Sequence, residues 1–109
     1  MRQFAFLFII LAALASSALI GCDTTAEREL NRAEVALDKA LDVNADAYAS
    51  DDYMAAEELL IEASDLAKDS RIQEARAAAI KSKLRAEDAE RKALERHKIM
   101  EAEMERLGR

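Results

Sequence analysis

The chain of 109 residues contains no proline, a single cysteine and only two glycines, Gly21 and Gly108. Proline and glycine form most tight turns, so between these two glycines a strand-rich fold lacks its usual turn residues. The lone cysteine, Cys22, has no partner for an internal disulfide. An all-helical chain is the remaining fold class.

Aromatic residues and positive charge are also scarce. All three phenylalanines precede position 22, so the remainder has only Tyr48 and Tyr53 as aromatic residues. Arg2 is the only charge before Cys22, which leaves 15 basic and 22 acidic residues after it, a net charge of −7. Such an excess of negative charge argues against a nucleic-acid partner.

The first 21 residues have the layout of a secretory signal peptide. Arg2 is followed by a run of 17 uncharged residues, Phe4 to Ile20. This run is shorter than a membrane-spanning helix, which needs about 20 apolar residues. The tetrapeptide Leu19-Ile20-Gly21-Cys22 resembles the lipobox of bacterial lipoproteins. This resemblance implies cleavage after Gly21, diacylglycerol on the Cys22 thiol and an acylated amine. An uncleaved signal anchor with a free thiol is the alternative.

The lipobox implies a place in the cell. Several acyl chains on one residue anchor a protein stably, whereas one chain holds it only marginally. We therefore expect residues 22–24 to be a lipidated N-terminus that holds the protein on a cell-envelope membrane, facing the periplasm. Asp23 resembles the signal that keeps enteric lipoproteins in the inner membrane, and the choice between inner and outer membrane stays open.

Residues 25–109 are predicted to form one helical domain. From Cys22 onwards, 19 of 88 residues are alanine, a composition typical of long helices. Small or apolar residues recur at steps of three and four, as in packed helices, and two breaks in this alternation separate three stretches. The stretches are Ala26 to Ala47, Tyr53 to Ala67, and Ile72 to Ala93.

Capping residues lie at both breaks and predict helix starts. Ser50 precedes two aspartates, and Ser70 forms a capping box with Gln73. We expect an all-α fold, an antiparallel helical hairpin plus a long third helix in an alanine-rich, coiled-coil-like bundle. A nearly continuous rod is the alternative. The three helices are expected at about Thr25 to Ala49, Asp51 to Lys68 and Arg71 to Leu107.

The third predicted helix is roughly twice as long as the second, so its end lacks a partner helix. This overhang keeps an apolar stripe at steps of three and four, and methionine suits an adaptable interface. We therefore expect the stripe to contact a partner, with a solvated helix end as the alternative. The predicted contact residues are His97, Met100, Met104 and Leu107.

Charge is divided unevenly along the chain. Residues 23–70 carry a net charge of −10, and residues 71–109 carry +3. Either the basic third helix complements the acidic hairpin, or it binds an anionic partner such as a cell-wall polymer or lipid head groups. Glu87 with Arg91 and Asp88 with Lys92 have the spacing of ordinary intrahelical pairs.

The residues of an enzyme site are missing from the pattern. His97 is the only histidine, and with Glu101 it supplies two ligands, too few for a zinc site. No nucleophile has a plausible base, and no glycine-rich phosphate loop is present. We expect no catalysis, metal or cofactor. The apolar patch of Tyr53, Met54 and residues 59–61 is expected to form hairpin core rather than a ligand groove.

Two regions resemble an uncharacterised family of alanine-rich bacterial envelope lipoproteins that have one small helical domain. They are Asp46-Ala47-Tyr48-Ala49-Ser50-Asp51 through Leu60, and Gln73-Glu74-Ala75-Arg76 through Glu87. This family has no established functional residues to carry over. Residues 51–56 also look like the second helix of a tetratricopeptide repeat. The plan is similar to that of murein lipoprotein, without its terminal lysine.

These features predict a lipid-anchored envelope protein with a structural or protein-interaction role. Its expected partners are the membrane, through the lipid anchor, and a second copy or another envelope protein. The alternative is a periplasmic binding module in which a tetratricopeptide-like hairpin takes a peptide or an anionic cell-wall polymer.

Overall fold

The computed structural model describes residues 26–108, and the predicted signal peptide, Gly21 and Cys22 lie outside the described residues. Within this range every regular element is a helix, which confirms the all-helical prediction. None of these helices is long and apolar enough to cross a membrane. The helices span residues 26–42, Ala45–Tyr48 (α2), Ser50–Lys68 (α3) and Ile72–Leu107 (α4).

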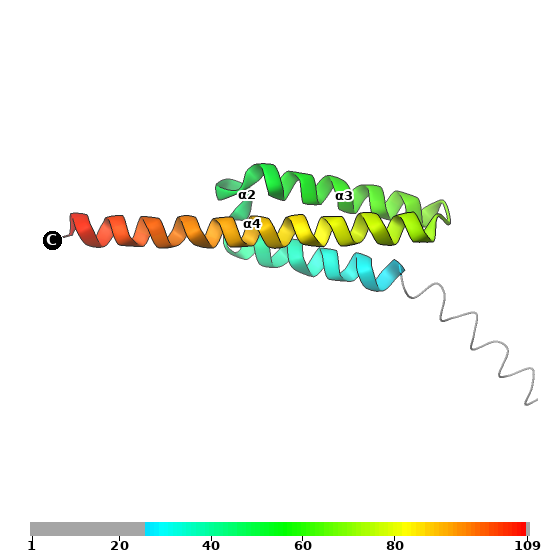
Figure 1. Cartoon of the computed structure of the whole chain (residues 1–109), viewed down its shortest axis with the longest axis horizontal. Helices are drawn as coiled ribbons and strands as arrows, with labels where there is room; N and C mark the ends of the chain where they lie inside the picture. Colours follow the sequence, from blue (N-terminus) through cyan, green and yellow to red (C-terminus); the bar gives the residue numbers. More distant parts are fainter. Residues whose placement is uncertain (1–25, 109) are drawn as a thin grey trace, which may run out of the picture.

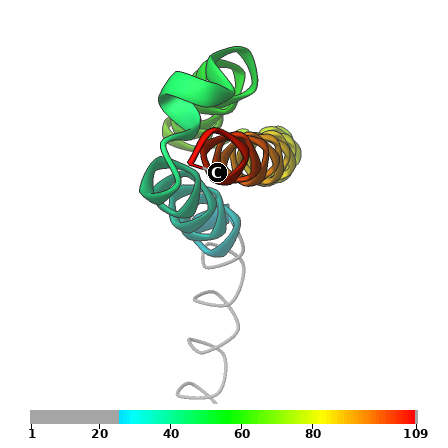
Figure 2. The same ribbon diagram turned by 90° about the vertical axis from the view of Figure 1, so that its left-hand side faces the viewer.

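The three long helices lie side by side. Figure 1 shows α3 running opposite to residues 26–42, and α4 returning past both of them. Viewed from the end, the three helices occupy the corners of a triangle (Figure 2). Because α4 has 36 residues and α3 has 19, α4 continues well beyond the bundle.

Alanine dominates the core between these helices. Among the buried hydrophobic residues of the described chain, Leu37 is the only one larger than alanine. Ala36, Leu37, Ala56 and Ala86 form one cluster, to which all three long helices contribute. Small side chains let helix axes approach closely, but each buries little apolar area. The helices are therefore close together around a thin core.

The first long helix ends earlier than the alanine pattern predicts. It stops at residue 42 because Asn44 adopts a left-handed conformation, with φ of 59°, and its N–H bonds to the Leu41 carbonyl. Asparagine tolerates this conformation and commonly ends helices there. The short helix α2 follows, so the expected helix through Ala49 is corrected to two helices with a turn between them.

The turn between α3 and α4 uses Ser70 differently from the prediction. Ser70 has φ of 61°, and the N–H groups of Ser70 and Arg71 bond to the carbonyls of Ala67 and Leu66. This pair of bonds is a Schellman motif, which closes the C-terminus of α3. Ser70 therefore cannot also cap α4, whose N-cap is Arg71 without a side-chain hydrogen bond. The predicted capping box is wrong.

The predicted cap at Ser50 and the predicted apolar patch are also revised. Ser50 is the first residue of α3, and the N-cap is Ala49, which makes no side-chain hydrogen bond. Tyr53 packs against the core, whereas Met54 and Ile61 are 56% and 63% exposed. These two residues lie on the outer face of α3, since Ala56 and Ala63 occupy its buried face. Only part of the patch is core.

Candidate functional site

His97 lies where α4 leaves the bundle and contacts the segment that follows the first long helix. Its Nε2 atom lies 2.9 Å from the carbonyl oxygen of Val43, and its ring forms a T-shaped contact with the ring of Tyr48 at a centroid distance of 5.0 Å. A carbonyl only accepts, so Nε2 carries the proton and donates. Val43 follows the first long helix, whose last carbonyls lack helical partners. His97 is therefore engaged within its own chain.

Beyond His97, residues 98–107 form the overhang of α4. Met100, Met104 and Leu107 are 40%, 69% and 86% exposed. They continue, at steps of three and four, the face that is buried at Ala86, Ala89 and Ala93 further back. We call Met100, Met104 and Leu107 the overhang stripe. The stripe extends the face of α4 that packs in the bundle into a region where no other helix of residues 26–108 covers it.

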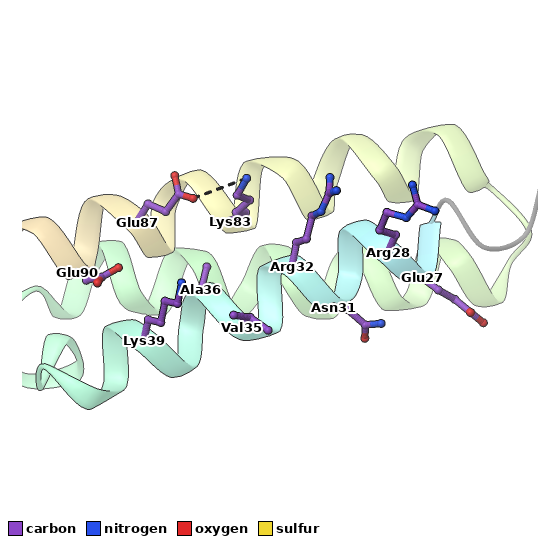
Figure 3. A pocket seen from close by; sticks show the side chains of 10 residues that line it. All are labelled: Glu27, Arg28, Asn31, Arg32, Val35, Ala36, Lys39, Lys83, Glu87 and Glu90. Atoms are coloured by element: carbon purple, nitrogen blue, oxygen red, sulfur yellow. Dashed lines mark ion pairs between the residues drawn. The ribbon is translucent and has the colours of Figure 1, made fainter.

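A groove with a volume of about 610 Å³ runs between residues 26–42 and α4. In Figure 3, Arg28, Arg32 and Lys39 point from the first helix toward α4, and Lys83 on α4 pairs with Glu87 at 3.8 Å. Four basic and three acidic side chains line the groove, which leaves little net charge for an anion. The lining residues are Glu27, Arg28, Asn31, Arg32, Val35, Ala36, Lys39, Lys83, Glu87 and Glu90.

One acidic side chain links α3 to α4. Asp52 is 7% exposed, accepts a hydrogen bond from Lys92 and lies 3.0 Å from the Nη1 atom of Arg85. Hydrogen bonding to Lys92, and then the charges of Lys92 and Arg85, hold the pKa of the Asp52 carboxyl below its usual range, although burial opposes them. Lys92 and Arg85 are therefore occupied within the molecule, as the intramolecular interpretation of the charge pattern expects.

The other ion pairs on α4 differ from the predicted ones. Asp88 pairs with Arg91, three residues on, rather than with Lys92. Arg91 also lies 3.4 Å from Glu95, and Glu87 pairs with Lys83 instead of Arg91. The tertiary contact with Asp52 draws Lys92 away from the intrahelical pair, and the remaining charges take their next neighbours.

Sequence reasoning missed two interhelical contacts. Ser82 is fully buried, and its hydroxyl donates to the Ala56 carbonyl at 2.7 Å. The sequence pattern indicates Asp52 only as one of the two aspartates that follow Ser50 at a helix start. A polar residue in an alanine seam is the signal that marks Ser82. For Asp52, the signal is its position four residues before Ala56, which places it on the buried face of α3, unlike its exposed neighbour Asp51.

Two predictions remain, one about metal binding and one about the lipidated cysteine. Among residues 26–108, no three His, Cys, Asp or Glu side chains are grouped to hold a metal ion. Cys22 and Gly21 lie outside the described residues.

Comparison of the whole chain with models of protein families, with curated proteins and with solved structures finds no match.

Proposed function

We propose that the protein is a lipid-anchored cell-envelope protein that presents the overhang of α4 to another protein. In this proposal the signal peptide is removed before Cys22, which carries the lipid on the periplasmic face of a membrane. The hairpin formed by residues 26–68 then supports the longer α4, and the role is protein interaction without catalysis.

The exposure of the overhang stripe carries this proposal. Met100, Met104 and Leu107 continue a buried helix face, yet are 40% to 86% exposed. Isolated helices of about 12 to 15 residues are marginal in water, so a free apolar overhang gains stability from a partner. Residue 26 and the C-terminus lie toward opposite ends of the bundle (Figure 1), so an anchor at Cys22 would direct the overhang away from the membrane.

A paired substitution tests the contact role. We expect Met100→Asp with Met104→Asp to abolish capture of the partner from solubilised envelopes, because two charges would replace the apolar stripe. Met54→Asp is the matched control, since Met54 is 56% exposed on α3. Circular dichroism checks that all variants keep their helicity. Unchanged partner recovery with the paired substitution would reject the overhang as the contact surface.

The lipid anchor has a separate test. Cells grown with radiolabelled palmitate should incorporate label into the protein, and Cys22→Ala should remove that label and release the protein from the membrane fraction. Equal labelling of both proteins would show that Cys22 is not the lipidated residue.

A second candidate function rests on the groove between residues 26–42 and α4. Arg28, Arg32 and Lys39 point into this groove and would contact a peptide or an anionic cell-wall polymer. Glu27, Glu87 and Glu90 offset part of this basic charge, and Arg32 also pairs with Glu29. Arg28→Glu with Lys39→Glu should then abolish capture of cell-wall material, and added salt should weaken that capture in the unchanged protein. Capture that ignores both changes would argue against this role.

A further inference from the structure

Within residues 98–107 the charges beside the overhang stripe are acidic, whereas the exposed Arg96 lies beside Met100 at the end nearer the bundle. Glu101 follows Met100 and Glu103 precedes Met104, so one carboxylate lies on each side of the stripe. Lys98 is on the opposite side of the helix, away from the stripe. Glu101 and Glu103 are exposed, and no ion pair joins either of them to another described residue. A partner would therefore meet an apolar strip between two carboxylates.

A second copy in parallel orientation does not fit this surface. The stripe continues the face of α4 that packs on residues 26–42 and α3. A parallel copy would place its own α4 along that face, where those two helices already lie (Figure 2). Only a helix that approaches from beyond the end of the bundle can cover the stripe.

A second copy in antiparallel orientation is opposed by charge. Matching the apolar steps places Met100 of one copy opposite Met104 of the other. The two Glu101 side chains then meet across the symmetry axis, and so do the two Glu103 side chains. Four carboxylates around one short apolar contact repel each other, and such like-charge contacts destabilise a pairing.

We propose that the overhang binds a partner helix whose apolar stripe is flanked by lysine or arginine. This inference rests on the proposed contact function and adds the chemistry of the partner. Basic residues at the flanking positions would pair with Glu101 and Glu103, while the partner's apolar side chains would cover Met100, Met104 and Leu107. The acidic flanks would exclude helices with acidic flanks of their own.

Two synthetic helical peptides test the partner chemistry on the purified full chain in mild detergent. Both carry the same leucine stripe over three heptads, one with lysine and one with glutamate at every flanking position. We expect fluorescence anisotropy to show at least tenfold tighter binding of the lysine peptide, weakened by added salt. Replacement of Glu101 and Glu103 by lysine should reverse the preference, and Met100→Asp with Met104→Asp should abolish binding of both peptides.

Control variants separate failure of this inference from failure of the proposed function. Met54→Asp should leave peptide binding unchanged. Equal binding of the two peptides, or binding of neither, would overturn the basic-flanked partner. So would a dimer in sedimentation that Met100→Asp with Met104→Asp dissociates. In each of these cases the contact function would still stand if the same paired substitution abolished capture of the envelope partner.

Discussion

The contact between Asp52 and α4 makes this side chain a stabilising residue. We expect Asp52→Asn to lower the free energy of unfolding by about 1–3 kcal/mol, because the ion pairs with Lys92 and Arg85 are lost. Chemical denaturation measures the change. Asp51→Asn is the control, since Asp51 is exposed and adjacent. A loss of the same size in both variants would show that helix-dipole charge, not the interhelical pair, is responsible.

The same residue predicts a dependence of stability on pH. The pKa of Asp52 is lowered in the folded protein, while an unfolded aspartate has a pKa of about 3.9. The carboxylate therefore stabilises the fold fully above the unfolded pKa, and its contribution is lost as pH falls through the folded pKa. The stability difference between the unchanged protein and Asp52→Asn should be constant near pH 7 and disappear in acid. A difference that grows in acid would contradict this assignment.

The turn between α3 and α4 offers a stabilising change at the scale of the element. Ser70 has φ of 61°, a left-handed conformation that is strained for a residue with a Cβ atom but not for glycine. We expect Ser70→Gly to raise the melting temperature, with a gain of about 0.5–1 kcal/mol in the free energy of unfolding. Ser70→Val should lower the melting temperature. A lower melting temperature of Ser70→Gly would contradict the left-handed conformation of Ser70.

The alanine seam of α4 sets the spacing between helices. Ala86 is fully buried in the cluster shared by the three long helices, so a larger side chain there must push them apart. We expect Ala86→Leu to destabilise the fold by about 1–3 kcal/mol in urea denaturation. Ala102→Leu makes the same change at an exposed position of the same helix, and should be nearly neutral. Equal effects would contradict close packing at Ala86.

At the scale of the whole molecule, the bundle and the overhang should be separable. Deletion of residues 99–109 should leave the melting temperature nearly unchanged, because Met100, Met104 and Leu107 are exposed. His97→Ala, by contrast, should lower stability by about 1 kcal/mol, because it removes the hydrogen bond to Val43 and the contact with Tyr48. A large loss of stability on deletion would show that the overhang belongs to the folding unit.

Local pattern was sufficient for the buried faces of α3 and α4, but not for the segment after residue 42, where Ala45 is buried and the predicted seam residue Ala47 is exposed. Helix periodicity depends on neighbours within one or two turns, so the spacing of alanines already identified the core face, and Ala56, Ala63, Ala86 and Ala93 are fully buried. The same periodicity identified the overhang stripe. The left-handed conformations of Asn44 and Ser70 were missed because asparagine and serine are also found inside helices or at helix starts. Only the hydrogen bonds that close the turn show that these two residues end a helix.

The sequence by itself determined that residues 26–108 are helical, that alanine forms the seams and that the last of their helices is the longest, because these properties follow from composition and local spacing. Only the tertiary structure decided which charges and polar groups meet. Asp52 is 40 residues from Lys92, and His97 is 54 residues from Val43. Contacts at such separations depend on how the helices pack beside each other, and no local pattern encodes that register.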